Sequence, residues 1–170
     1  DIAKLESMVV PRPKEVLDIS RVMDETLRPL MAQADEKGIQ LKIRTADDVP
    51  PVSIDSMRFP WVLTNLVGNA IRYTENGGTV LLTVKKNGPR CEFTCTDTGS
   101  GIDKRFIAKI FDRYTQYSER EKSGTIGLGL AIVKEIIEQH GGDISVESRV
   151  GQGTTFHFWI PIGEIKEKES

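Results

Sequence analysis

Residues 124–130 read GTIGLGL, and residues 131–142 follow as AIVKEIIEQHGG. The second stretch predicts a helix, because its apolar residues recur three or four positions apart and Gly141 and Gly142 suit a left-handed cap at its end. The glycines at the entrance of this helix are unexpected. Each glycine costs about 1 kcal/mol relative to alanine inside a helix, and Ser, Asp or Asn would cap the helix better.

This glycine-rich entrance has two interpretations on its own. Glycine suits backbone that turns with positive φ or passes close to another group, and a helix N-terminus attracts anions through its unpaired N–H groups and its dipole. One interpretation is therefore an anion-binding site. The other is a flexible loop with a helix after it, and the rest of the chain has to distinguish them.

The composition indicates a globular domain. A chain of 170 residues fits one domain with a single core, and 38% hydrophobic and 28% charged residues are ordinary for such a protein. The net charge of −2 provides no basic surface for nucleic acid. No apolar run approaches the roughly 20 residues of a membrane span. Because the chain starts at Asp1 without a methionine, we expect a fragment of a longer protein.

The two cysteines do not predict a disulfide or a metal site. Cys91 and Cys95 share one face of a predicted strand, about 13 Å apart, which is too far for a disulfide. With His140 and His157 as the only histidines, a zinc site is not expected. Reduced cysteines in a core indicate a cytoplasmic compartment.

Apolar periodicity and turn residues give an order of elements. We expect a short strand at 15–17, a helix at 19–38, a strand at 39–43, an extended piece at 52–54, a helix at 55–74 capped by Asp55, strands at 80–84 and 91–97 around a hairpin turn at 87–88, a short helix at 103–114, a mobile polar loop at 115–126, a helix at 130–140, and strands at 144–146 and 156–160. Helices beside an antiparallel meander predict an α+β fold, a two-layer sandwich with a mixed, mostly antiparallel sheet and helices on one face.

The helix at 55–74 has an unusual polar side. Asn65, Asn69, Arg72 and Tyr73 are three or four residues apart and so share a face. An asparagine oxygen suits Mg²⁺, which takes few protein ligands beside phosphate oxygens, and the arginine one turn away suits a phosphate. The alternative is a buried amide pair that is satisfied within the protein.

A carboxylate ends the strand at 91–97. Counting by twos from Cys91 places Asp97 on the inward face, where an unpaired carboxylate is costly. Gly99 and Gly101 let the backbone pass close to a flat ligand, and the carboxylate would accept a hydrogen bond from an exocyclic amine such as that of adenine. The alternative is a β-turn in which the aspartate bonds to its own loop.

Taken in order, these motifs resemble those of the catalytic and ATP-binding domain of sensor histidine kinases, within the wider ATPase group of gyrase, the large heat-shock chaperone and mismatch-repair proteins. The resemblance covers about residues 14–162. The matching motifs are NLVGNAIRYT (65–74) for the N box, DTGSGI (97–102) for the first glycine box, IFDRY (110–114) for the F box, GTIGLGLAIV (124–133) for the second glycine box and GQGTTF (151–156) for the last.

The resemblance implies roles for individual residues. Asn69 would ligate Mg²⁺, with Asn65 beside it, and Arg72 and Tyr73 would face the phosphates. Asp97 would bind the adenine amine. The remaining nucleotide-binding positions would be Gly99, Gly101, Ile102, Gly124, Thr125, Gly127, Leu128, Gly129, Leu130 and Thr154, and residues 115–126 would form a lid over ATP.

The resemblance also implies an organisation and partners. Residues 1–10 would end a dimerisation helix and its linker, residues 11–163 would form the catalytic domain, and residues 164–170 would be a charged tail. The partners would be the phosphoacceptor domain of the same protein and a response regulator, with no role for nucleic acid. The domain would be cytoplasmic, in a homodimeric parent that is either soluble or membrane-anchored, and the fragment itself is compatible with a monomer.

Five positions depart from the family pattern, and one of them, Trp61, is unusual near the start of its helix. Arg72 stands where lysine is frequent, which keeps the charge but changes the reach. Tyr114 stands where phenylalanine is usual, and Ile126 replaces a small or hydroxylated residue of the lid. Pro60 removes a backbone donor and would bend the entrance of its helix.

These features predict phosphoryl transfer rather than hydrolysis. Hydrolytic relatives have a glutamate where Asn65 stands, and an amide is no general base at neutral pH, so the domain would position Mg-ATP for a histidine located elsewhere. His140 would end a helix with a charge that suits the dipole, and His157 would be structural, so the fragment would not phosphorylate itself. The alternatives are a degenerate nucleotide-binding scaffold and an ATP-hydrolysing clamp or chaperone.

Overall fold

The computed structural model describes residues 3, 7–113 and 129–163. Its helices and strands are β1 (Glu15–Leu17), α2 (Ile19–Lys37), β2 (Gln40–Thr45), β3 (Val52–Ile54), α3 (Arg58–Tyr73), β4 (Thr79–Asn87), β5 (Arg90–Asp97), α4 (Lys104–Ile107), α5 (Gly129–Gln139), β6 (Asp143–Arg149) and β7 (Gly153–Pro161). In the described part of the chain, none of the helices combines the length and the apolar character that a membrane span requires.

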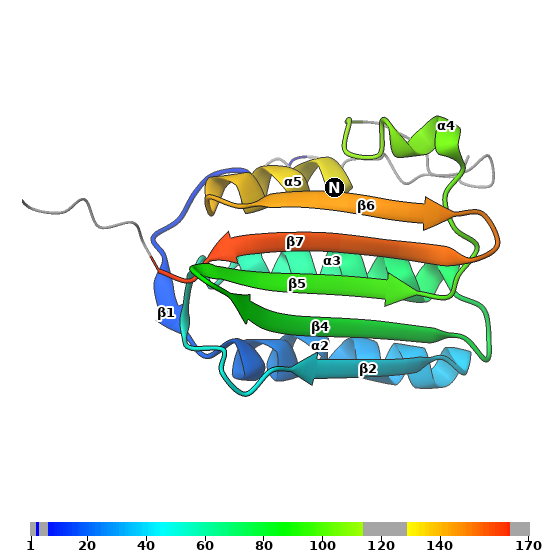
Figure 1. Ribbon diagram of the computed structural model, residues 1–170, viewed down its shortest axis with the longest axis horizontal. Helices are drawn as coiled ribbons and strands as arrows, with labels where there is room; N and C mark the ends of the chain where they lie inside the picture. Colours follow the sequence, from blue (N-terminus) through cyan, green and yellow to red (C-terminus); the bar gives the residue numbers. More distant parts are fainter. Residues whose placement is uncertain (1–2, 4–6, 114–128, 164–170) are drawn as a thin grey trace, which may run out of the picture.

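The larger sheet and helices α2, α3 and α5 form two layers (Figure 1). The sheet has five strands in the order β2-β4-β5-β7-β6. Strand β2 pairs parallel with β4, and the other three pairings are antiparallel. Helices α2, α3 and α5 lie on one face of this sheet, while β1 and β3 form a separate two-stranded sheet. The predicted two-layer α+β sandwich is confirmed.

The core lies between the sheet and its helices. Alternate residues of β4 and β5 are buried, as the period of a half-buried strand requires. The Phe93 and Phe158 rings stack at 4.5 Å, and Phe59 of α3 packs on Phe93 at 5.4 Å between ring centroids. Cys91 and Cys95 are free and buried, as predicted. Burial raises the pKa of each thiol to about 12, so both behave as small apolar groups.

Local signals explain the bounds of the longest helix. The Asp18 side chain accepts a hydrogen bond from the Ser20 amide at the start of α2, which satisfies one of the amides that a helix leaves unpaired. At the other end Gly38 has a φ of 74°. Its amide returns to the carbonyls of Ala34 and Asp35, a left-handed cap for which glycine carries no steric cost.

The bounds of two helices, α4 and α3, differ from the prediction. Helix α4 covers only Lys104–Ile107, so the expected helix over 103–114 was too long. Residues 108–113 form turns instead, and Ile110 within them is buried in the core. Helix α3 begins at Arg58. Pro60 therefore occupies its first turn, where a missing amide donor breaks no intrahelical hydrogen bond.

Several predictions concern residues that the structure does not describe. The lid at 115–126 and the charged tail at 164–170 lie outside the described residues, and so do Tyr114 and Ile126.

His140, which follows the last residue of α5, corrects one prediction. The side chain is buried, its Nε2 accepts the Asp55 amide at 3.0 Å, and its Nδ1 lies 2.8 Å from the Ile136 carbonyl. Since Nε2 is an acceptor, the ring is neutral with its proton on Nδ1. Burial lowers the pKa of His140 against the effect of the Ile136 bond, so the expected interaction of a charged histidine with the helix dipole is wrong.

Candidate nucleotide-binding site

A pocket opens where α3 and β5 end and where α5 and β7 begin. Its floor and walls come from segments far apart in the sequence, which the sheet order brings together. The residues lining it are Asn69, Ala70, Tyr73, Asp97, Ser100, Gly101, Ile102, Ile110, Leu130, Thr154 and Phe156. The pocket is therefore mostly apolar, with a few polar groups, which is the usual character of a small-molecule site.

Asp97 is the one acidic side chain among these lining residues, and it is only 7% exposed. Its Oδ1 accepts the Gly99 amide at 2.8 Å and the Thr154 amide at 3.2 Å. Within the described residues Oδ2 makes no hydrogen bond. Burial raises the pKa of Asp97, although both amide bonds lower it. Both interpretations of this residue hold in part, because it bonds to its own loop and also lines a pocket.

The glycines near Asp97 permit close approach of backbone segments. A Cβ atom on Gly99 would lie 2.4 Å from the Tyr73 carbonyl oxygen, and one on Gly153 would lie 2.0 Å from the Asp97 carbonyl oxygen. The Ser100 amide donates to the same Tyr73 carbonyl at 3.1 Å. The end of α3, the loop after β5 and the start of β7 are thus packed backbone to backbone, which any larger residue would prevent.

Sequence reasoning missed a hydroxyl network behind this pocket. Ser148 of β6 accepts the Ile102 amide at 2.8 Å and donates to the Gly153 carbonyl at 3.0 Å. Its Oγ lies 2.8 Å from the Thr154 hydroxyl, and because its single proton is used, Thr154 is the donor. Ser148 therefore joins two pocket segments, the loop after β5 and the start of β7, through β6. Gly153 and Thr154 are only five and six positions from Ser148, but the Ile102 amide is 46 positions away, and no local pattern marks that contact.

Lining residues with a sequence signal were also overlooked. Phe156 has the same inward parity along β7 as Phe158 and Ile160, so the alternation already placed it beside Thr154. Ile110 was assigned to a helix and to the F-box motif, but not to the nucleotide site.

The polar face of α3 is divided between the pocket and its surroundings. Asn69 and Tyr73 line the pocket. Asn65 lies beside the first residue of α5, since a Cβ atom on Gly129 would be 2.8 Å from its Nδ2, and its buried Oδ1 has no hydrogen bond within the described residues. Arg72 is exposed and outside the described lining, with its guanidinium 5.8 Å from the Tyr73 ring centroid.

The glycine-rich entrance is only partly described. Gly129 is the first residue of α5, and the buried side chain of Leu130 lines the pocket. The N-terminal end of α5 and the C-terminal end of α3 therefore lie at the same pocket. The predicted positions Gly124, Thr125, Gly127 and Leu128 lie outside the described residues.

Metal binding at this site would rest on asparagine oxygens. Across the described residues, no group of three or more His, Cys, Asp or Glu side chains is arranged to hold a metal ion. The unsatisfied Oδ1 of Asn65 and the pocket residue Asn69 are hard oxygen donors. They fit Mg²⁺, which takes most of its ligands from phosphates and water.

Comparisons with known proteins agree with this geometry. Residues 54–164 match the family described as histidine kinase-, DNA gyrase B- and HSP90-like ATPase. The circadian input-output histidine kinase CikA of Synechococcus elongatus is 37% identical over 165 residues, which cover 95% of this chain and 22% of that protein. The chain thus spans about a fifth of the length of this curated relative.

Two solved structures extend the comparison. Full-length ShkA in complex with AMPPNP matches with a TM-score of 0.80 and 32% identity, over 94% of this chain and 33% of that one. Histidine kinase ThkA in complex with the response regulator TrrA matches with a TM-score of 0.75 and 26% identity, over 98% of this chain and 49% of that one. The family match includes every residue of the pocket, and the chain therefore belongs to the histidine kinase-, DNA gyrase B- and HSP90-like ATPase family.

Proposed function

We propose that the chain is the catalytic domain of a sensor histidine kinase, which binds Mg-ATP in the pocket and presents the γ-phosphate to a histidine of a separate dimerisation domain. The observation that carries this proposal is Asp97. A buried carboxylate with one oxygen held by two amides and the other without a donor among the residues that the structure describes suits a ligand that brings its own N–H group.

The surroundings of Asp97 favour a planar base. Ala70, Ile102, Ile110 and Phe156 supply apolar walls, which stabilise a flat aromatic ring by excluding water. An adenine placed among them would donate its exocyclic amine to Asp97. Guanine has a carbonyl oxygen where adenine has its exocyclic amine. That oxygen would face the Asp97 carboxylate, and two acceptors repel each other, which supports specificity for adenine.

The far end of α3 and the start of α5 suit the phosphates. The α5 N-terminus carries unpaired amides and a partial positive charge, and Arg72 adds a full charge to the last turn of α3. We assign Mg²⁺ to Asn69, with Asn65 beside it, and we assign phosphate contacts to Arg72, Tyr73 and the glycines of residues 124–129. Bound Mg²⁺ would neutralise charge on the phosphates, which is the main requirement of phosphoryl transfer.

This set of residues favours transfer over hydrolysis. Asn65 occupies the position of a general base but is an amide. His140 has both ring nitrogens engaged in the core, and His157 lies on β7 between the inward Phe156 and Phe158, on the sheet face away from the helices. Neither histidine is a suitable acceptor, so the phosphate would pass to another domain.

The remaining parts of the proposal concern the parent protein. We assign residues 1–10 to the end of a dimerisation helix and its linker, residues 11–163 to the catalytic domain and residues 164–170 to a charged tail. The partners would be a phosphoacceptor domain and a response regulator, which the ThkA–TrrA complex supports by similarity. The free thiols of Cys91 and Cys95 support a cytoplasmic, reducing compartment.

Calorimetric titration with AMPPNP, with and without Mg²⁺, tests the nucleotide site. We expect Mg²⁺-dependent binding that weakens at least about tenfold in Asp97→Asn, because the amide nitrogen opposes an amine donor. Asp47→Asn, at an exposed position, is the matched control. Absence of binding by the folded chain would favour the alternative of a degenerate scaffold. An Asn69→Asp variant with unchanged Mg²⁺ dependence would remove the metal role from α3.

Incubation with γ-labelled ATP tests the transfer step. We expect no covalent label on the isolated chain. A label that resists base and is lost in acid, as phosphohistidine does, would contradict the assignment of the acceptor to another domain.

A further inference from the structure

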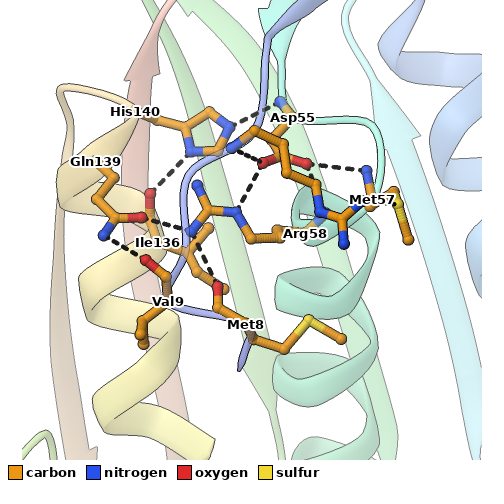
Figure 2. Close-up of polar contacts among 9 residues, drawn as sticks. Met8, Val9, Asp55, Met57, Arg58, Ile136, Gln139 and His140 are labelled. Carbon is orange, nitrogen blue, oxygen red and sulfur yellow. Dashed lines mark hydrogen bonds and ion pairs between the residues drawn. The ribbon is translucent and has the colours of Figure 1, made fainter. Parts of the chain in front are cut away.

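A second polar cluster lies away from the pocket and contains a buried ion pair (Figure 2). Arg58 Nε donates to Asp55 Oδ2 at 2.7 Å, and the two side chains are only 3% and 1% exposed. Asp55 Oδ1 accepts the amides of Met57 and Arg58 at 3.1 and 3.0 Å. Burying an ion pair away from water is costly unless its hydrogen-bonding groups are satisfied. The segment that shields this pair from water should therefore form hydrogen bonds with Asp55 and Arg58.

The covering chain is the N-terminal segment at residues 8–12, and the cluster holds its main chain. Arg58 Nη1 donates to the Met8 carbonyl at 2.9 Å, and Gln139 Nε2 donates to the Val9 carbonyl at 2.9 Å. These contacts are visible in Figure 2. The Arg12 amide donates to Asp55 Oδ2 at 3.2 Å. Because the bonds go to backbone atoms, they restrain the path of the chain.

We call Asp55, Arg58 and Gln139 the entry clamp. Arg58 Nη1 also donates to Gln139 Oε1, so the clamp joins the start of α3 to the end of α5. Met8 and Val9 are half-buried and pack against the core. The segment is thus held by polar bonds from two helices and by apolar contacts beneath them.

The entry clamp and the pocket lie at opposite ends of the same two helices. Arg58 begins α3 and Gln139 ends α5, whereas Asn69 and Tyr73 near the end of α3 and Leu130 at the start of α5 line the pocket. Helices α3 and α5 pack against each other. From Arg58 to Asn69 the helix rises roughly 16 Å. A continuous α-helix fixes the separation and direction of its two ends, so intact α3 and α5 hold the clamp and the pocket in one relative geometry.

We propose that the entry clamp docks residues 8–12 rigidly onto α3 and α5 and thereby sets the direction in which the preceding chain meets the nucleotide pocket. Two consecutive carbonyls held by two different helices restrain orientation as well as position. Any reorientation of the pocket relative to the preceding chain therefore occurs N-terminal to Met8 or opens the clamp. The docking goes beyond the proposed nucleotide binding and does not depend on it.

Amide exchange in the unmodified chain provides the first test. The Arg12 amide is flanked by Pro11 and Pro13, which have no amide, and it bonds to Asp55. In a docked segment we expect it to exchange at least about tenfold more slowly than in an unstructured peptide. Exchange at the unstructured rate would overturn the proposal, whatever the variants do.

Pulsed EPR distances provide the second test. Labels at Val10→Cys and Lys86→Cys lie at exposed positions, and the buried native thiols, whose pKa is about 12, do not compete. Gln139→Glu keeps an oxygen that accepts from Arg58, but it removes the Nε2 donor to the Val9 carbonyl and places a carboxylate oxygen beside that carbonyl. Glu138→Gln changes the neighbouring, exposed residue of α5 and is the matched control.

We expect a narrow distance distribution in the unmodified chain and in Glu138→Gln, and a distribution at least about twofold broader in Gln139→Glu. A narrow distribution in Gln139→Glu, or one already broad in the unmodified chain, would overturn the docking role. AMPPNP affinity should stay within about twofold throughout, because the clamp is remote from the pocket. Loss of AMPPNP binding in every chain would overturn the proposed function and leave the docking result standing.

Discussion

Asp97 and Thr154 lie directly opposite each other in the pairing of β5 with β7, and the carboxylate of one accepts the amide of the other at 3.2 Å. The Gly99 amide donates to the same oxygen. Two backbone donors from two segments thus orient the carboxylate before any ligand binds. This pre-organisation reduces the ordering cost that a nucleotide would otherwise meet on binding.

Nucleotide affinity should depend on the ionisation of Asp97. Burial raises the pKa of this carboxyl above its usual 3.8, and protonation replaces an acceptor with a donor facing the adenine amine. We therefore expect AMPPNP affinity to fall as the pH drops through the raised pKa of Asp97. Calorimetry over a pH series, with Asp97→Asn as a variant lacking this titration, measures the effect. Parallel profiles for the two chains would contradict it.

Ser148→Ala should weaken the packing of the pocket segments without changing any residue that lines the pocket. The substitution leaves the Ile102 amide and the Thr154 hydroxyl without their partner, and an unsatisfied buried group costs about 1–3 kcal/mol. We expect a loss of that order in the free energy of unfolding by urea, together with weaker AMPPNP binding. Ser145→Ala, at an exposed position of the same strand, should change neither quantity. Equal behaviour of the two variants would show that the hydroxyl network is unimportant.

Two glycine-to-alanine substitutions should have opposite signs. A Cβ atom on Gly99 would lie 2.4 Å from a backbone oxygen of Tyr73, whereas one on Gly68 within α3 would meet nothing within 4 Å. We expect Gly68→Ala to stabilise the chain by about 0.5–1 kcal/mol through helix propensity. Gly99→Ala should destabilise it by about 1–3 kcal/mol, because backbone must move. Denaturant unfolding compares the two, and a stabilising Gly99→Ala would be incompatible with the close packing described.

The Arg58–Asp55 pair should be sensitive to loss of one partner. Arg58→Met leaves the Asp55 carboxylate buried without its cation, and such changes cost about 3–5 kcal/mol. The Arg21–Glu25 pair has side chains that are 80% and 62% exposed, so Arg21→Met should cost less than about 1 kcal/mol. Unfolding free energies of both variants test the contrast. A small effect of Arg58→Met would mean that water reaches Asp55 freely.

Stability should decrease in mildly acidic solution because of His140. Burial lowers its pKa below 6.5 in the folded chain, so between that lowered value and 6.5 the unfolded chain binds more protons. The free energy of unfolding therefore falls as the pH decreases through this window. His140→Gln, which keeps an acceptor for the Asp55 amide, should lose this dependence. Measurement of unfolding across the window decides, and an unchanged slope in the variant would assign the effect to another group.

Much of the fold and the pocket follows from local sequence. The alternation of Val80, Leu82 and Val84 requires a half-buried strand. The order of the motifs identifies the family because asparagine, aspartate and glycine each occur where a nucleotide site needs their chemistry. Such features are determined by a residue and its near neighbours in the chain, so they can be predicted from the sequence.

Other features depend on contacts between residues distant in the chain. Arg58 bonds to Met8 and to Gln139, which lie 50 and 81 positions away, and no local pattern predicts that bridge. The same holds for the bond between the Ile102 amide and Ser148, which are 46 positions apart. It also holds for His140, whose neutral state follows from burial against Asp55 rather than from its place at a helix end. The sequence by itself determined the elements, the motifs and the family. Only the tertiary structure decided which polar side chains meet and which are buried, because burial and charge state are properties of the packed chain.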